Sequence, residues 1–269
     1  MKQLFKTTIW ILLFGTLLIG ACQKSPEQNN QQSSTQQQTA GQTRESSQQQ
    51  PAGQPSEQPQ QVSGDAQSAS QQLVPLEIKL PKPMFVGTPT NVAVPNLEKP
   101  LGKPRPPFLA PAGTKNIAFK KPVSGSDEQP IIGELSLITD GDKEAAEGSY
   151  VELGPKLQYV TIDLKSRNTI YAILVWHFHK QAVVYNDVIV QVADDPDFIS
   201  NVQTIFNNDI DNSAGRGVGK EMSYIETSEG KLIDARGVQG RYVRLFSRGN
   251  SANELNHYIE VEVYGKAVQ

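Results

Sequence analysis

His177 and His179, two of the three histidines in this 269-residue chain, are separated by one residue. Residues two apart in a strand point to the same face, so the two imidazoles are predicted to lie side by side. Neutral imidazole is a common metal ligand, and metal-binding barrels use this spacing, but they add a glutamate a few residues later. Residues 180–185 contain no glutamate. We therefore interpret the pair either as surface histidines or as residues that contact a ligand.

A polar stretch at residues 207–220 resembles two known loops and matches neither. Counted from Asp209, its start resembles an EF-hand, but the sixth position is Ala214 and the twelfth is Lys220, where calcium binding needs Gly and Glu. Its end, Gly-Arg-Gly-Val-Gly-Lys, resembles a phosphate loop, but Glu221 follows where Ser or Thr is required. The stretch is predicted to be a flexible loop, and long loops are often functional.

Three runs of alternating residues predict the strands that would position these side chains. Residues 165–168 separate the first run from the second, and the Asp-Asp-Pro of residues 194–196 ends the third. The apolar positions are Val160, Ile162 and Leu164, then Ile170, Ala172, Leu174, Trp176 and Phe178 on one predicted face, then Val188, Val190 and Val192. Three strands without a helix between them predict an antiparallel all-β domain.

Five further short runs complete the predicted fold. They are Val202–Phe206, Tyr224–Thr227, Lys231–Asp234, Tyr242–Ser247 and Tyr258–Tyr264. About eight strands between residues 116 and 265 indicate an antiparallel jelly-roll sandwich. In the last run Ile259, Val261 and Val263 are expected to face inward, leaving Glu260 and Glu262 outward.

Charge and composition narrow the classes of function. The net charge is -3 and the isoelectric point is about 5.7, so the chain lacks the basic character expected of a nucleic-acid-binding protein. No serine-hydrolase elbow, cysteine nucleophile or glycosidase motif is visible, which favours a protein that is not an enzyme. Carboxylates that pair only in the fold stay open as an alternative.

The N-terminus has the layout of a secretory signal over residues 1–21. Two lysines precede an apolar run that ends in small residues, and the only cysteine of the chain, Cys22, follows. Residues 19–22 resemble a bacterial lipobox, which implies cleavage before Cys22 and attachment of lipid to it. The alternative is an uncleaved anchor, although the apolar run is shorter than the ~20 residues of a membrane span. Because residue 23 is Gln rather than Asp, the outer membrane is favoured over the inner one.

Two segments of unlike composition precede the domain. Residues 22–72 are almost wholly Gln, Ser, Pro, Gly, Ala and Asn and are predicted to be a disordered tether, with self-association of the glutamines as the alternative. Residues 73–115 are rich in proline but also carry many apolar side chains, which predicts an extended arm lying on the domain. The alternative is a proline-rich ligand for a protein partner, centred on residues 103–107. Residues 266–269 are predicted to form a tail.

Five sequence features occur together, in order, over the last ~150 residues. They are Asn-Ile-Ala at 116–118, Thr-Asp-Gly-Asp at 139–142, Val-Thr-Ile-Asp-Leu at 160–164, Arg-Tyr-Val-Arg-Leu at 241–245 and Ile-Glu-Val-Glu-Val-Tyr-Gly at 259–265. This order resembles the discoidin, or coagulation factor V/VIII type C, family of galactose-binding-like jelly rolls, which includes bacterial carbohydrate-binding modules. The disulfide that joins the domain ends in many animal members has no counterpart here.

The resemblance implies a structural calcium ion between an Asp-Gly loop and a glutamate at the start of the last strand. In this chain the corresponding residues are Asp140, Asp142, Ser149 and Glu260. Calcium prefers several oxygen ligands at about 2.3–2.6 Å, and an ion shared by distant carboxylates would hold the loop to the closing strand. The alternative is that Asp140 begins a simple turn and that Glu260 is a solvated surface residue.

The resemblance also implies that polar residues after the second strand contact the ligand, where His177, His179 and Lys180 stand. Counting strands places this loop and the loop after Val202–Phe206 at the same end, which adds Asn208, Asp209 and Arg216 to one predicted ligand mouth. The loop at 248–257 shares that end only if Lys231–Asp234 is not a strand. A sugar ring would need an exposed aromatic side chain, for which Tyr185 and Tyr258 are the candidates.

Two functions follow as hypotheses. The first is a membrane-tethered module that binds a glycan or another ligand of the cell envelope. The second is an interaction or scaffolding lipoprotein that uses the jelly roll and the proline-rich arm.

Overall fold

The computed structural model describes residues 72–85, 87, 89 and 92–268. The predicted signal segment, Cys22 and the tether as far as residue 71 lie outside the described residues. The strands are β1 (Leu73–Pro75), β2 (Leu109–Pro111), β3 (Lys115–Asn116), β4 (Val123–Gly125), β5 (Val151–Leu153), β6 (Gln158–Trp176), β7 (Ile189–Ala193), β8 (Gln203–Asn207), β9 (Lys231–Ser247), β10 (Asn256–Tyr258) and β11 (Glu260–Ala267), with one 3-10 helix, η1 (Leu135–Thr139). All ladders between these strands are antiparallel, so the all-β prediction is confirmed.

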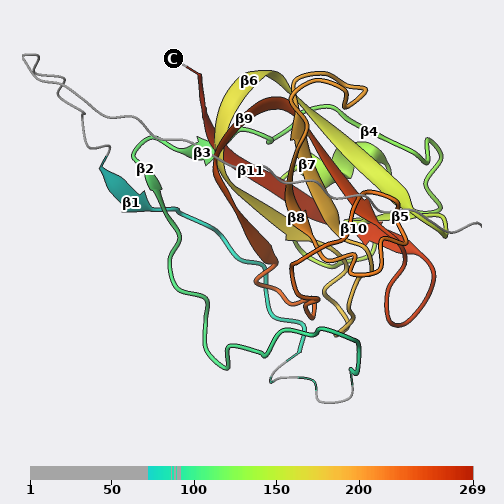
Figure 1. Cartoon of the computed structure of the whole chain (residues 1–269). Helices are drawn as coiled ribbons and strands as arrows, with labels where there is room; N and C mark the ends of the chain where they lie inside the picture. The colour runs from blue at the N-terminus through green and yellow to red at the C-terminus, as the bar shows by residue number, and fades with distance from the viewer. Residues whose placement is uncertain (1–71, 86, 88, 90–91, 269) are drawn as a thin grey trace, which may run out of the picture. The chain divides into compact units, whose positions relative to one another are not determined.

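Two long strands, β6 and β9, fold the main sheet over itself. Both arch across the top of the molecule in Figure 1, so that each contributes one half to each of two layers. Pairing between them is interrupted between Asp163 and Asn168 and again between Ile170 and Ala172, and Lys165 takes a left-handed conformation at φ 72°. Bulges of this kind bend a strand and increase its twist. We refer to this bent end as the arch end and to the opposite end as the loop end.

The predicted strands differ from the observed ones at these bends. Residues 165–168 were predicted to be a turn between two strands, but they lie within β6, and pairing with β9 resumes at Asn168. Lys231–Asp234 and Tyr242–Ser247 were predicted as separate strands, and both lie in β9. The predictions were wrong because polar residues at a bulge have the same composition as a turn. Tyr224–Thr227, also predicted to be a strand, is loop.

The first layer has the order β3-β11-β6-β9 and the second has the order β4-β6-β9-β7-β8. Apolar side chains from both layers meet between them in one buried cluster. Its members include Val160, Ile162, Ile173, Val175, Val190, Val192, Val243, Leu245, Val261 and Val263. The alternating residues that predicted the strands therefore fill the core of the sandwich.

The outer face of the first layer is also buried, which the sequence pattern did not predict. Ala172, Leu174 and Trp176 lie there in a second cluster, whereas Ile170, expected on the same face, joins the central core because the bulge intervenes. On β11, Glu260 and Glu262 were expected to face solvent but are 0% and 6% exposed. Glu260 contacts Gly141 and Glu262 pairs with Lys143, while a segment from outside the sandwich covers the apolar cluster beside them.

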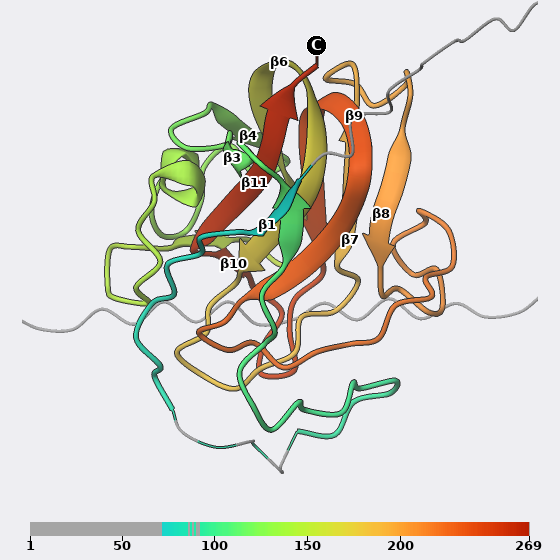
Figure 2. The same ribbon diagram turned by 90° about the vertical axis from the view of Figure 1, so that its left-hand side faces the viewer.

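That segment is the proline-rich arm, which packs on the domain as predicted. Leu76, Ile78 and Phe108 contact the cluster around Trp176, and β1 pairs with β2 so that the arm runs out and back, as Figure 2 shows. Arg105 fixes the part of the arm that leads back to β2. Its guanidinium donates to the carbonyl oxygens of Gly230 at 2.9 Å and Glu229 at 3.0 Å. The arginine considered as a docking residue for a partner thus contacts the domain's own loop.

No helix among the described residues has the length and apolar character needed to span a membrane.

Candidate functional site

Three loops meet at the loop end of the sandwich. They are residues 177–188 after β6, residues 208–230 after β8 and residues 248–255 after β9. The third was expected there only if Lys231–Asp234 was not a strand. The 248–255 loop lies at the loop end even though Lys231–Asp234 is part of a strand. The reason is that β9 is bent, so that its first and last residues are both at the loop end (Figure 1). An isolated bridge between Tyr185 and Asn250 joins the first loop to the third.

His177 is not a surface residue. Its ring is 0% exposed, its Nδ1 lies 2.6 Å from Glu226 Oε1, and the ring stacks on Tyr185 with a centroid distance of 4.3 Å. Glu226 is also 0% exposed. The prediction that His177 contacts a ligand is therefore wrong, because its partner is a carboxylate brought from the 208–230 loop, 49 residues away.

His179, Asn208 and Asp209 are buried as well and have structural partners. His179 is 0% exposed and its Nε2 lies 2.9 Å from Lys143 O. Asn208 Oδ1 accepts the N–H of Val188 at 2.7 Å, and Asp209 accepts the N–H groups of Ser213 and Ala214 at 3.0 and 2.9 Å. These three residues were predicted to line an open mouth, and the burial of their side chains contradicts that. They hold the loops in place instead.

Lys180 and Arg216 are exposed, whereas His177 and His179 are buried, so the four side chains do not share one open surface. The Arg216 guanidinium lies over the ring of Phe246, 5.1 Å from its centroid. Phe246 belongs to a cluster with Ile189 on the outer face of the second layer. Arg216 is therefore placed beside the sheet face rather than with His177 and His179.

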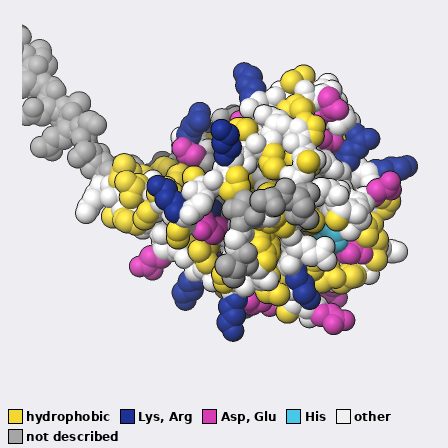
Figure 3. Space-filling view, turned by 90° about the horizontal axis from the view of Figure 1, so that it is seen from below, with side chains coloured by type: hydrophobic (Ala, Val, Ile, Leu, Met, Phe, Trp, Pro, Cys, Tyr) yellow, Lys and Arg dark blue, Asp and Glu magenta, His cyan; other side chains and the backbone are white. Residues whose placement is uncertain are grey.

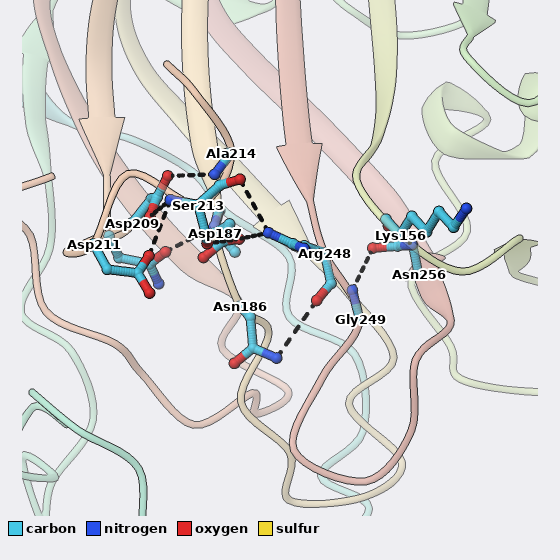
Figure 4. Close-up of polar contacts among 12 residues, drawn as sticks. Lys156, Asn186, Asp187, Asp209, Asp211, Ser213, Ala214, Arg248, Gly249 and Asn256 are labelled. Atoms are coloured by element: carbon cyan, nitrogen blue, oxygen red, sulfur yellow. Dashed lines mark hydrogen bonds and ion pairs between the residues drawn. The ribbon is translucent and has the colours of Figure 1, made fainter. Parts of the chain in front are cut away.

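The polar cluster that the loops do form is centred on Arg248 and Asp187 (Figure 4). Arg248 Nη1 donates to Ser213 O at 3.0 Å and lies 3.8 Å from Asp187 Oδ2. Ser213 Oγ donates to the same Asp187 oxygen at 2.8 Å, and Asn186 Nδ2 lies 3.5 Å from Arg248 O. We call Asn186, Asp187, Ser213 and Arg248 the loop-end cluster, and each of the three loops contributes to it.

The acidic side of the loop-end cluster is crowded. Carboxylate oxygens of Asp187, Asp209 and Asp211 all lie within 4.8 Å of one another. Burial raises the pKa of the Asp187 carboxyl, and the neighbouring carboxylates of Asp209 and Asp211 add to the effect. The N–H groups that Asp209 accepts and the Arg248 guanidinium offset this charge. In Figure 3, which views the molecule from below, acidic and basic side chains of the described residues are interspersed.

Neither predicted aromatic platform is exposed. Tyr185 is 1% exposed and its hydroxyl lies 2.9 Å from His257 Nδ1, while Tyr258 is 0% exposed and its hydroxyl lies 3.2 Å from Ser247 Oγ. The suggestion that either ring stacks on a sugar is therefore wrong.

Hydrogen bonds link the loop of the calcium prediction to the closing strand, but the carboxylates of Asp140, Asp142 and Glu260 are not among those of the described residues whose oxygens all lie within 4.8 Å of one another. Gly141 N–H donates to Glu260 Oε2 at 3.1 Å, so the Asp-Gly loop touches the start of β11. Within the loop, Ser149 Oγ donates to Asp142 Oδ2 at 2.8 Å, and Asp140 Oδ1 accepts the N–H of Asp142 at 2.8 Å. Glu260 Oε1 is buried and has no partner among the described atoms. A buried carboxylate oxygen without a partner is a ligand of the kind that a hard cation such as calcium prefers.

Sequence reasoning missed Asn186, Asp187 and Arg248. A usable signal was present, because Asp187 immediately precedes the buried Val188 and Arg248 immediately follows the last residue of β9. Polar residues at strand ends are candidates for a site on a loop. The signal could not be used without the bend in β9, which decides where residue 248 lies.

No family model matches the sequence, and no curated protein matches it. Similar solved structures include the CBM32 module of AlyQ in complex with 4,5-unsaturated mannuronic acid, at 16% identity and a TM-score of 0.40, covering 54% of this chain and 95% of the module. Another is chitosan-binding module 1 of a chitosanase/glucanase from Paenibacillus sp. IK-5, at 19% identity and a TM-score of 0.38, covering 56% and 99%.

A fucose-binding module of Streptococcus pneumoniae matches at 20% identity and a TM-score of 0.40, covering 56% of this chain and 97% of the module. A family 89 glycoside hydrolase from Clostridium perfringens matches at 20% identity and a TM-score of 0.41, and there the chain spans 15% of the enzyme.

Proposed function

We propose that the sandwich is a non-catalytic carbohydrate-binding domain and that its ligand contacts the loop-end cluster. The observation that carries the proposal is that three loops, distant in sequence, bring Asn186, Asp187, Ser213 and Arg248 into one hydrogen-bonded group. Such a group offers donors and acceptors to a hydroxyl-rich ligand, and polar sites of this kind reject analogues that leave their groups unpaired. The resemblance of residues 116–265 to discoidin-type modules agrees with the proposal.

Arg248→Gln is expected to weaken glycan binding by about 1–3 kcal/mol, since one charged donor to the ligand is lost. A glycan array probed with the chain identifies a ligand, and titration calorimetry then compares the variants. Arg167→Gln is the matched control, because Arg167 lies at the arch end with 52% of its side chain exposed, against 45% for Arg248, and also has an aspartate partner. Equal losses in both variants would argue against the loop-end cluster as the site.

We also propose that the chain is a lipoprotein of the bacterial cell envelope, held by lipid on Cys22 and favoured at the outer membrane. The short apolar run and small residues before Cys22 support this. Cys22→Ser is expected to move the protein from the membrane fraction to the soluble fraction and to remove the mass of the acyl chains. If the variant stays with the membrane and the parent shows no acyl mass, the lipid anchor is excluded.

A further inference from the structure

Arginine and aromatic side chains alternate with core residues along the second half of β9. Leu245 points into the core, whereas Phe246 belongs to the cluster on the outer face of the second layer. Arg244 is two residues before Phe246 and so lies on the same outer face, because side chains two apart in a strand share a face. Its cross-strand neighbours there are Thr161 of β6 and Gln191 of β7.

Four contacts hold Arg244 against this face. Its guanidinium carbon lies 4.4 Å from the centroid of the Tyr159 ring and 4.0 Å from that of Phe198. Nε donates to Thr161 Oγ1 and Nη2 donates to Pro196 O, both at 2.9 Å. A guanidinium fixed in this way has little rotational freedom left to lose when it binds an anion.

Arg216 reaches the same face from the 208–230 loop. Its guanidinium lies over the ring of Phe246, which is two residues along β9 from Arg244. Burial lowers the pKa of the Arg244 guanidinium, and the nearby positive charge of Arg216 lowers it further. Among the described residues, neither guanidinium has a carboxylate within 4.0 Å, the limit for an ion pair. The acids that face Arg244 from the β7–β8 loop, Asp195 and Asp197, act on it only at longer range.

The row continues into the loop-end cluster. Arg248 follows two residues after Phe246, and it bonds to Ser213, whose neighbour Ala214 packs in the cluster with Phe246. Two residues advance a strand by about 6.6–6.8 Å, so Arg244 and Arg248 would stand roughly 13 Å apart along β9, with Arg216 over the position between them. Arg248 is paired with Asp187, which leaves Arg216 and Arg244 as two neighbouring guanidiniums that suit a long ligand repeating its negative charge.

We propose that Arg216 and Arg244 form an anion-binding contact on the outer face of the second layer, which takes the carboxylate or sulfate groups of an acidic polysaccharide. The inference rests on the proposed function, since it extends the carbohydrate site from the loop-end cluster along β9. A guanidinium pairs with the two oxygens of a carboxylate or sulfate through parallel donors. The aromatic rings beneath stabilise the cations through their π faces rather than stacking on sugar.

The experiment measures binding of the full chain to paired polysaccharides by titration calorimetry and affinity electrophoresis. The acidic probes are polygalacturonate, chondroitin sulfate and dextran sulfate, and the neutral probes are fully methyl-esterified polygalacturonate and dextran. The expected result is binding to an acidic probe that weakens as NaCl is raised from about 50 to 500 mM, because salt screens exposed charges.

Arg216→Gln combined with Arg244→Gln is expected to weaken that binding at least about tenfold, the scale of one lost charge-assisted hydrogen bond. The matched control combines Arg167→Gln with Arg236→Gln, which removes the same charge at the arch end, where these side chains are 52% and 87% exposed. If the double variant does not fold, Arg216→Gln alone still tests the contact, since Arg216 is exposed and its replacement is not expected to disturb the fold. It is expected to show part of the loss at an unchanged melting temperature.

Each other outcome counts against one proposal or both. If the control variant loses as much as the Arg216/Arg244 variant, the effect is one of overall charge and the contact is overturned. Binding to neutral probes that is sensitive to Arg248→Gln, without binding to acidic ones, would overturn the contact while supporting the proposed function. Failure to bind any polysaccharide, including every glycan of the array, would overturn both. Binding of anionic phospholipid vesicles in preference to the acidic polysaccharides would also overturn the contact.

Discussion

Glu226→Ala is expected to lower the free energy of unfolding by about 3–5 kcal/mol, because it leaves the fully buried His177 without its partner. Both side chains are 0% exposed, and Glu226 Oε2 and His177 Nε2 have no other partner among the described atoms. The unfavourable free energy of burying these two groups is therefore offset mainly by the single contact of 2.6 Å between His177 Nδ1 and Glu226 Oε1. Urea unfolding followed by circular dichroism measures the difference.

Glu226→Gln separates the contribution of the hydrogen bond from that of the carboxylate charge. The glutamine keeps an oxygen that accepts the Nδ1–H of His177, so it is expected to cost less than half as much as alanine. Glu229→Gln is the control, since Glu229 lies three residues on and its carboxylate accepts only the N–H of Arg105, at 3.2 Å. If Glu226→Ala unfolds at the same urea concentration as the parent protein, the buried pair contributes little to stability.

Calcium is expected to raise the melting temperature of metal-stripped protein, and Glu260→Gln is expected to abolish that response. An ion bound only by the folded state at a hundredfold excess over its Kd stabilises it by about 2.7 kcal/mol. We propose Glu260 Oε1 as one ligand of this ion, and Asp140, Asp142 and Ser149 as the others. Glu128→Gln, on an exposed side chain, is the control. A melting temperature that neither calcium nor chelator changes would exclude the site.

The same glutamate makes the metal-free protein sensitive to pH. Burial raises the pKa of Glu260 to about 9, with Glu262 and Asp140 adding to the shift. The folded state therefore holds a proton that the unfolded state has lost above its ordinary pKa of about 4.3. Stability is expected to fall as pH rises between these two values, by up to about 1.4 kcal/mol per pH unit. Differential scanning calorimetry from pH 5 to pH 8 tests this, and Glu260→Gln should flatten the profile.

The strands of the sandwich could be predicted because their core positions alternate. Val160 and Ile162 in β6, and Val261 and Val263 in β11, are all 0% exposed and lie in one cluster. The arm could be predicted because its leucine, isoleucine and phenylalanine side chains are too apolar for a free linker. In each case the information is local, since a period of two or an apolar composition is visible within a short window.

The candidate site could not be predicted to the same degree, because it depends on contacts between distant residues. Nothing near His177 reveals that Glu226 will meet it, and nothing near Arg244 reveals that its guanidinium will lie against Tyr159 and Phe198. The bends in β6 and β9 matter most, since they decide which loops share an end. Their bulges are built from polar residues that are equally compatible with a turn.

The position of Gln72 determines where on the domain a pull on the preceding residues would act. Its carbonyl accepts the N–H of Ala112, whose own carbonyl accepts Lys266 Nζ, and Lys266 pairs with Thr169 near the bend in β6. The chain thus enters the described part toward the arch end, whereas the loop-end cluster lies at the other. Leu73, where the chain enters the β1–β2 ladder, pairs with Pro111, where the chain leaves the ladder for the sandwich. Tension between residue 72 and the sandwich would therefore act first on this pair, and the other two pairs would open after it.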